Sequence, residues 1–226
     1  MTTISGENFD LNYGSEVKFA NPTGGEGGEE GADVIKVWYT TGAGGYNTFA
    51  YYKDEEHTPG SEEDETGWWP TDSEEEAIFP AGTPFWVRTQ PGDNKSMTVS
   101  GAVESDADVE VTLVGNKYNL LINPYPTSID FNDKGKTVEV KNATGGEGGE
   151  EGADVIKIWY TAGAGGYNTF AFYKDEEHTS GSEEDETGWW PTDSEEETIV
   201  PAGAGFWLRT QPGDNKSIVF KSPIAK

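Results

Sequence analysis

An internal repeat constrains this chain more than any other feature. Residues 24–99 align without a gap on residues 145–220, and 12 of the 76 aligned positions differ. Near identity over this length indicates a duplicated folding unit, and about 100 residues is an ordinary size for one domain. The sequence therefore predicts two tandem domains, residues 1–103 and residues 104–226.

The pattern within each copy favours an all-β fold. Short apolar runs alternate with clusters of Gly, Pro, Asn and Asp, and no stretch shows the apolar periodicity of a helix. Substitutions between the copies keep apolar character, as where Val87 becomes Leu208. We expect two tandem β-sandwich-like modules, Ig-like or jelly-roll-like, with antiparallel sheets. The strands expected in the first copy are residues 34–39, 47–52, 67–70, 77–79, 85–88 and 96–99.

The two copies differ at their beginnings. Residues 108–114 and 118–122 are apolar runs joined by a Gly-Asn turn, which is typical of a β-hairpin, and no counterpart precedes the first copy. We therefore expect the first module to lack its leading strand and to present an unpaired sheet edge, which a neighbouring chain could complete by strand addition. The expected assembly strand carries Tyr118, Leu120, Ile122 and Tyr125.

Two segments of the second copy carry a family resemblance. Residues 118–126 read Tyr-Asn-Leu-Leu-Ile-Asn-Pro-Tyr-Pro, and residues 199–208 read Ile-Val-Pro-Ala-Gly-Ala-Gly-Phe-Trp-Leu. They resemble the NPYP strand and the late turn and strand of β modules that recur in secreted surface proteins of Bacteroidetes and Verrucomicrobia. The first copy lacks the NPYP strand, and the acidic insertions around Glu62 and Glu183 depart from the family pattern. The resemblance implies a β architecture and an extracellular or cell-surface location, and it implies no chemistry.

The net charge of the chain limits the kinds of partner that it can bind. Forty-two acidic residues against 15 basic ones give a formal charge of −27. This charge repels nucleic acid and anionic membrane surfaces, and no apolar run reaches the length of about 18 residues that a membrane span needs. We expect no nucleic-acid partner and no membrane insertion. The chain has no cysteine, which excludes disulfides and thiolate metal sites.

Each copy contains an acidic loop with many oxygen ligands, and Ca²⁺ prefers six to eight oxygens. Ca²⁺ is therefore a candidate cofactor, although the spacing is not that of an EF-hand. The alternative is a solvated acidic surface that opposes aggregation of an exposed sheet edge. The candidate ligands are Asp54, Glu55, Glu56, Glu62, Glu63, Asp64, Glu65, Asp175, Glu176, Glu177, Glu183, Glu184, Asp185 and Glu186.

Paired tryptophans follow each acidic loop, and exposed indole rings can stack on the faces of sugars. The candidate glycan platform comprises Trp68, Trp69, Trp189 and Trp190. Adjacent residues in a strand point in opposite directions, so at most one tryptophan of each pair is expected in the core. The alternative is that Trp38, Trp68 and Trp86 fill the interior of the sandwich.

Catalytic chemistry is not indicated. A glycosidase-like pair of carboxylates needs one raised pKa in an apolar cleft, which a dense exposed cluster does not supply. His57 and His178 have no serine, cysteine or second histidine at a catalytic spacing. We expect a protein that is not an enzyme.

These features favour an extracellular structural protein. Repeated β units with little sequence divergence suggest a shared packing geometry, so we expect a self-assembling filament or surface-layer subunit, joined by strand addition and stabilised by cations. One alternative is a non-catalytic, bivalent carbohydrate-binding protein. Another is an inert spacer in an adhesin.

Overall fold

A computed structural model gives the fold of the chain. It describes residues 9–12, 17–25, 28–39, 45–71, 77–79, 83, 85–92, 95–99, 107–146, 149–160, 166–178, 182, 185–192, 197–213 and 215–223. These residues contain strands and turns and no helix, and accordingly no helix that could cross a membrane. The chain divides into a first unit, Thr2–Ala102, and a second unit that begins at Val103 and runs to Lys226.

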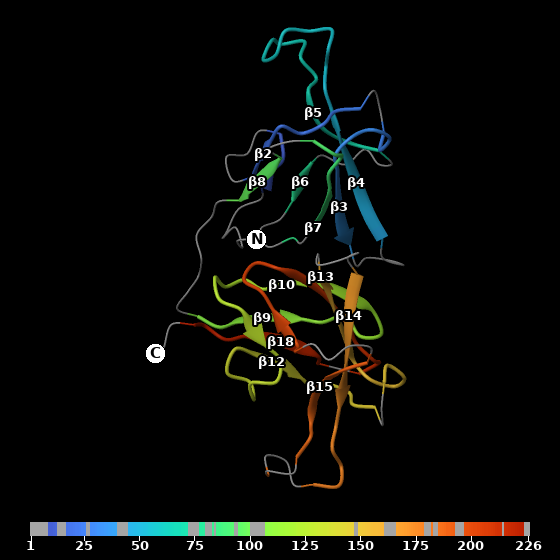
Figure 1. Cartoon of the computed structure of the whole chain (residues 1–226), viewed down its shortest axis with the longest axis vertical. Helices are drawn as coiled ribbons and strands as arrows, with labels where there is room; N and C mark the ends of the chain where they lie inside the picture. The colour runs from blue at the N-terminus through green and yellow to red at the C-terminus, as the bar shows by residue number, and fades with distance from the viewer. Residues whose placement is uncertain are drawn as a thin grey trace. The chain divides into compact units, whose positions relative to one another are not determined.

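The second unit contains a five-stranded antiparallel sheet, whose order is β10, β17, β13, β14, β15. These strands are Tyr118–Ile122, Gly205–Arg209, Val155–Tyr160, Gly166–Tyr173 and Gly188–Pro191, respectively. β13 and β14 are long strands that follow each other in the chain and lie side by side in the sheet (Figure 1).

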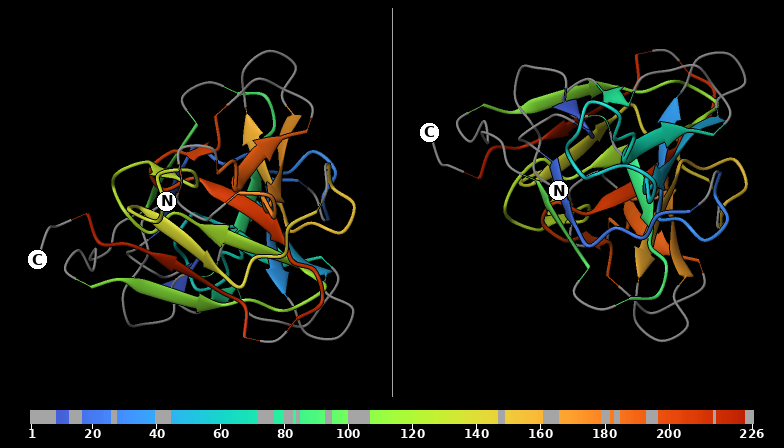
Figure 2. Two further views of the ribbon diagram at one scale, coloured as in Figure 1. Left: turned by 90° about the horizontal axis from the view of Figure 1, so that it is seen from below. Right: turned by 90° about the horizontal axis from the view of Figure 1, so that it is seen from above.

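A three-stranded sheet of the order β12, β18, β9 forms the other layer of the second unit. Its strands are Val138–Lys141, Ser217–Phe220 and Val109–Thr112, which appear yellow, dark red and green side by side in Figure 2 (left). A short pair of strands, β11 (Ile129–Asp130) and β16 (Ile199–Val200), completes the unit.

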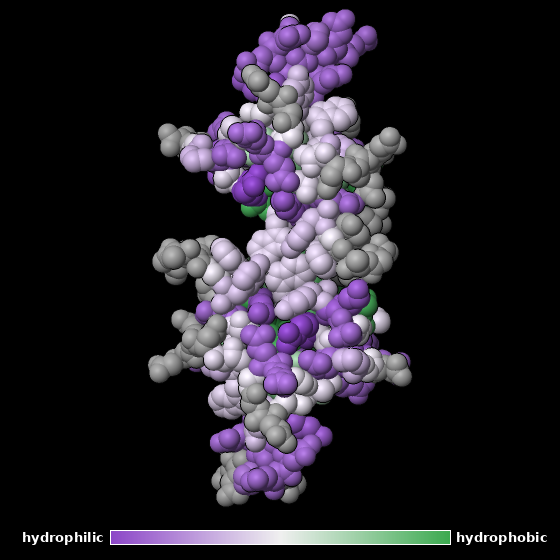
Figure 3. Space-filling model, turned by 90° about the vertical axis from the view of Figure 1, so that its right-hand side faces the viewer, coloured by the Kyte–Doolittle hydropathy of each residue, from purple (hydrophilic) through white to green (hydrophobic). Residues whose placement is uncertain are grey.

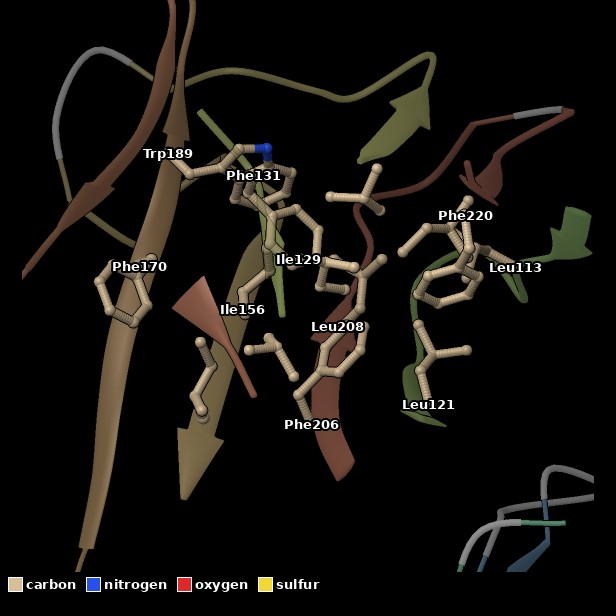
Figure 4. Close-up of a cluster of buried hydrophobic side chains, with 14 of the residues drawn as sticks. Leu113, Leu121, Ile129, Phe131, Ile156, Phe170, Trp189, Phe206, Leu208 and Phe220 are labelled. Atoms are coloured by element: carbon tan, nitrogen blue, oxygen red, sulfur yellow. The ribbon is translucent and has the colours of Figure 1, made fainter. Parts of the chain in front are cut away.

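The core of the second unit lies between these layers. Side chains from alternate positions of β13 and β17 meet side chains of β12 and β18, as the strand period of two requires. Figure 4 shows the aromatic and aliphatic groups filling this space. The buried cluster comprises Leu113, Leu121, Tyr125, Ile129, Phe131, Val138, Ile156, Ile158, Phe170, Trp189, Val200, Phe206, Leu208, Ile218 and Phe220.

The first unit repeats this plan with fewer described strands. Its larger sheet has the order β5, β4, β3, β7, and its smaller sheets pair β2 with β8 and β1 with β6. In chain order, β1 to β8 are Phe9–Asp10, Val17–Ala20, Val34–Tyr39, Gly45–Tyr52, Gly67–Pro70, Ile78–Phe79, Phe85–Arg88 and Ser96–Val99.

The predicted fold class is confirmed: the chain is all-β, with β-sandwich-like modules and antiparallel sheets. The strand boundaries differ slightly from those expected. β4 begins at Gly45, two residues before the apolar run, and β9 covers only Val109–Thr112 of the expected residues 108–114.

Candidate functional site

The chain reverses direction between β9 and β10, and residues 109–122 give one strand to each sheet of the second unit. β9 and β10 therefore do not pair with each other, and the expected two-stranded hairpin is wrong. β10 pairs with β17 along its whole length, from Tyr118 opposite Arg209 to Ile122 opposite Gly205. β9 pairs in the same way with β18. Asn116 adopts a positive φ of 57° in the connecting turn, as an Asn in a tight turn readily does. We call this segment the completing hairpin for its reversal of chain direction alone.

The completing hairpin closes the core of the second unit. Leu113 and Leu121 are buried in the main cluster, and Tyr125, just after β10, lies with them. Alternation along β10 places Leu120 and Ile122 on the opposite face from Leu121, and Tyr118 is exposed there. The predicted assembly strand is therefore used within its own unit in this structure.

Two buried asparagines hold the completing hairpin in place. Asn119 Oδ1 accepts a hydrogen bond from the Val114 N–H at 2.9 Å, and its Nδ2 donates across the ladder to the Leu208 carbonyl at 3.2 Å. Asn123 Nδ2 donates to the carbonyls of Thr127 at 2.7 Å and Pro201 at 3.1 Å. The Asn of the NPYP segment thus has a structural role, since buried amides must find partners.

Polar contacts tie the hairpin to both sheets. The Leu113 N–H donates to the Lys216 carbonyl at 2.9 Å, and the Thr210 hydroxyl donates to the Val114 carbonyl at 2.9 Å. Ser217 Oγ donates to Glu110 Oε1 at 2.6 Å. The hairpin is therefore anchored by hydrogen bonds as well as by apolar burial.

The first unit has no such hairpin among the described residues. β7 pairs only with β3, and β8 pairs only with β2, in the part of the chain that the structure describes. Their counterparts β17 and β18 each have two neighbours. We call the sides of β7 and β8 that have no neighbouring strand among the described residues the open edge.

Loss of burial in the first unit concentrates at the open edge. Met97 of β8 is 36% exposed, whereas its counterpart Ile218 is fully buried. Val87 is half-buried where Leu208 is fully buried, and Thr89 is exposed where Thr210 is buried. Some positions away from this edge match, such as Phe49 and Phe170, which are both fully buried. The open edge thus uncovers part of the core of the first unit.

The open edge presents backbone groups as well as side chains. In the second unit the Thr210 N–H donates to the Lys117 carbonyl, on the side of the completing hairpin. Backbone groups alternate in direction along an antiparallel strand, so those of Leu208 and Phe206 face the hairpin too. Val87 and Phe85 occupy these positions in β7. Their N–H and C=O groups therefore point away from β3.

The acidic loop of the first unit, residues 53–66, is organised around one buried carboxylate. Asp54 Oδ2 lies 2.8 Å from His57 Nδ1, and Asp54 also accepts the N–H groups of Glu56, His57 and Glu65. The hydrogen bond from His57, with these N–H groups, holds the pKa of Asp54 at about 2. The same hydrogen bond raises the pKa of His57 above its usual value.

A second aspartate fixes the tip of the same loop. Asp64 accepts the Gly60 N–H at 2.6 Å and the Thr66 N–H at 3.0 Å. A hydrogen bond from the Thr66 side chain and these N–H groups lower the pKa of Asp64. The glutamates of the loop are exposed, and the loop projects beyond the strands (Figure 1) as a strongly hydrophilic surface (Figure 3).

The acidic loop of the second unit repeats this arrangement. Asp175 Oδ2 lies 2.8 Å from His178 Nδ1, and the pKa of Asp175 is likewise held at about 2, chiefly by this hydrogen bond. Asp185 accepts the Thr187 N–H, while Glu183 and Glu184 lie outside the described residues. Among the described residues, no group of three or more His, Asp or Glu side chains is arranged to hold a metal ion. The calcium site stays a prediction.

Each tryptophan pair places one ring in the core and one at the surface. Trp68 and Trp189 are buried, whereas Trp69 and Trp190 are 49% and 51% exposed. The backbone of Trp189 is held by Asn132, whose side-chain amide exchanges two hydrogen bonds of 2.8 Å with it. Alternation along the strand therefore decides which indole meets solvent.

The exposed rings are held in fixed positions. Trp69 Nε1 donates to the Glu65 carbonyl at 2.8 Å, and Trp190 Nε1 donates to the Glu186 carbonyl at the same distance. Trp69 borders an open groove of about 380 Å³, lined also by Tyr52, Pro70 and Thr71.

The expectation that Trp38 and Trp86 fill the interior is wrong. Both are half-buried and alternate with core residues, so they lie on the outer face of their sheet, and Trp159, the counterpart of Trp38, is 43% exposed. Trp159 packs edge-on against Tyr167 with ring centroids 4.9 Å apart.

A buried ion pair in each unit was not anticipated from the sequence. Lys216 Nζ lies 2.7 and 2.9 Å from the two carboxylate oxygens of Asp154, and both side chains are almost wholly buried. Lys95 and Asp33 form the equivalent pair in the first unit, where the lysine side chain is 12% exposed. No local motif signals this pair, because its partners lie far apart in the sequence.

Comparison with known proteins adds no family assignment. No protein-family model, curated protein or solved structure matches the chain. The resemblance to bacterial surface modules therefore stays a prediction, and the proposed function rests on the geometry of the two units.

Proposed function

We propose that this chain is a non-catalytic structural protein of the cell surface or extracellular space, which assembles with copies of itself by strand addition. The observation that carries the proposal is the open edge of the first unit. Its strands β7 and β8 each have one neighbour among the described residues, whereas their counterparts β17 and β18 each have two.

Two properties of the open edge favour association, its backbone hydrogen-bonding groups and its partly exposed apolar side chains. Unpaired N–H and C=O groups are a template for a further strand. Met97 and Val87 are also partly exposed at this edge. Burying such apolar side chains stabilises an interface by about 25 cal/mol per Å². A second chain that pairs with β7 or β8 would supply hydrogen-bond partners for the backbone and would bury these apolar side chains.

The high negative charge of the chain limits where two copies can make contact. A charge of −27 opposes indiscriminate contact between copies, and the acidic loops are hydrophilic surfaces in both units. Contacts then concentrate where backbone pairing offsets the repulsion. Association should accordingly strengthen as salt screens the charges.

The test is the assembly state of the purified chain. Sedimentation velocity across protein concentration and NaCl, followed by electron microscopy with and without Ca²⁺, should show oligomers that grow with concentration. Val87→Pro is the decisive variant, because it removes an N–H that faces the open edge and spares the ladder to β3. Val87→Leu, which copies the residue of the second unit, is the matched control and should assemble. A wild-type chain that stays monomeric throughout would contradict the proposal.

A second candidate function is carbohydrate binding, favoured by the two exposed indoles. Trp69 and Trp190 are each fixed by a hydrogen bond to a backbone carbonyl and are about half exposed. A rigid aromatic face at the surface suits stacking against a sugar ring. Binding to an array of neutral polysaccharides that is lost in Trp69→Ala with Trp190→Ala, and kept in the wild type, would support it.

A further inference from the structure

We propose that the groove beside Trp69 binds a sugar that carries an ammonium group, that is, a protonated amino sugar, and that the surface beside Trp190 is a second site of the same kind. This inference rests on the second candidate function, carbohydrate binding, because it names the class of sugar. It does not depend on self-assembly, because β5 and β7 lie at opposite edges of the larger sheet of the first unit.

The groove lies on the outer face of that sheet. Ala50 of β4 is opposite Trp69 of β5, and alternation along β4 puts Tyr52 on the same face. Gly25 and Gly28 border the groove as well, so backbone forms part of its wall. Its volume of about 380 Å³ falls within the range of small-molecule sites. The groove is therefore large enough for a ligand and has an aromatic lining.

The indole of Trp69 is a preformed platform in this groove. Its Nε1 donates to the Glu65 carbonyl at 2.8 Å, and the residue remains 49% exposed. Because this bond uses the only hydrogen-bonding group of the ring, the exposed part of the indole offers a ligand an aromatic surface alone. Such a surface attracts the C–H groups of a sugar ring and also a cation.

Carboxylates determine the sign of the charge that the groove accepts. Glu65 lines it, and none of the described lining residues is basic. The hydroxyl of Tyr52 reports the local potential. Its pKa is raised, first by desolvation and then by the negative charges of Asp54, Glu65 and Glu56. Residues 54–76 contain 11 acidic residues and no lysine or arginine. An ammonium group over the indole is therefore attracted by the ring and by the carboxylates, whereas an anionic sugar is repelled.

The internal repeat provides the same arrangement in the second unit. Ala171 is opposite Trp190, and Trp190 Nε1 donates to the Glu186 carbonyl at 2.8 Å. The pKa of Tyr173 is raised, first by desolvation and then by carboxylates at the same three positions of the acidic loop. One chain is therefore expected to bind two ligands.

The experiment compares three β-linked trisaccharides, which consist of glucosamine, N-acetylglucosamine or glucose. Their binding is measured by isothermal titration calorimetry at a pH that keeps the glucosamine amine protonated. The buffer contains about 0.15 M NaCl, which screens general attraction to the acidic chain. The glucosamine trisaccharide should occupy two sites per chain and bind at least about tenfold more tightly than the other two, because it alone carries positive charge.

Variants with a single groove provide matched controls. Trp190→Ala should halve the number of sites, and adding Trp69→Ala should abolish binding while urea unfolding shows that both units remain folded. In the Trp190→Ala background, Glu65→Gln should weaken glucosamine binding at least about fivefold, since it removes the carboxylate and keeps the backbone carbonyl that holds Trp69. Glu62→Gln removes the same charge from an exposed loop position and should change the affinity less than about twofold.

The outcomes separate this inference from both candidate functions. Binding that depends on Trp69 but is no tighter for glucosamine would uphold carbohydrate binding and overturn the selection for an amino sugar. Binding that survives loss of both indoles, or that Glu62→Gln weakens as much as Glu65→Gln does, is general attraction to an acidic chain and would overturn the site. No binding of any trisaccharide would contradict the inference and carbohydrate binding alike. Val87→Pro should bind as the wild type does, so a failure of self-assembly is recognised separately.

Discussion

Replacement of Lys216 by methionine provides a stringent test of the packing in the second unit. Its ammonium group lies within 2.9 Å of both oxygens of Asp154 and 2.7 Å from the Thr144 hydroxyl. Lys216→Met removes the cation and leaves the carboxylate buried. Loss of one partner from a buried ion pair typically costs about 3–5 kcal/mol.

The structure places the expected cost at the low end of that range. Asp154 keeps two backbone donors after the substitution, the Thr144 N–H at 3.0 Å and the Gln211 N–H at 2.6 Å. Hydrogen bonds to a charged group each stabilise it by about 1.5–3 kcal/mol, so part of the lost interaction is retained. We expect Lys216→Met to lower the free energy of unfolding of the second unit by about 3 kcal/mol.

The first unit supplies the matched control. Lys95→Met breaks the equivalent pair where the lysine side chain is 12% exposed rather than 2%, so water can solvate the remaining carboxylate. Its cost should be lower by at least about 1 kcal/mol. Hydrogen exchange measured in increasing urea, read from peptides of each unit separately, measures both values. A cost below about 1 kcal/mol for Lys216→Met, or a larger cost for Lys95→Met, would refute the reasoning.

Further predictions follow from the tryptophan pairs and the acidic loops. Trp189→Ala should destabilise the second unit by about 3–5 kcal/mol, and Trp190→Ala should change its stability by less than about 0.5 kcal/mol, both measured by urea unfolding. Asp54→Asn should lower the pKa of His57 toward 6.5 and leave that of His178 unchanged, as NMR titration would show. Because the folded pKa of His57 is raised, its protonated form stabilises the loop below pH 6.5, and this contribution is lost as the pH rises through the folded pKa. The lowered pKa of Asp54 stabilises the loop above pH 3.8 and is lost as the pH falls through about 2, so acid unfolding of the Asp54→Asn variant should lack this step.

The sequence predicted strands well where local pattern decides structure. The run Phe85–Arg88 is apolar, is bounded by turn residues and forms β7 as expected. The Trp68-Trp69 pair was also interpreted correctly, because alternation along a strand does not depend on the rest of the fold.

Long-range features could not be predicted in the same way. Trp38 is a large aromatic residue of the kind that fills cores, yet Ile35 and Val37 occupy the core-facing side of β3, so alternation places Trp38 on the outer face. Asn119 and Asn123 look like turn residues, and only the tertiary structure shows that their amides hold a buried hairpin. The exposure of Met97 could not be expected either, because it depends on which strands flank β8.

Residue-resolved amide exchange is the most direct test of the open edge. At a concentration where the chain is monomeric, the amide of Val87 should exchange at least about 100-fold faster than that of Leu208, whose strand is paired on both sides. The difference should disappear when the edge is completed by assembly. Equal protection of the two amides in the monomer would show that the edge is already paired, and it would contradict strand addition.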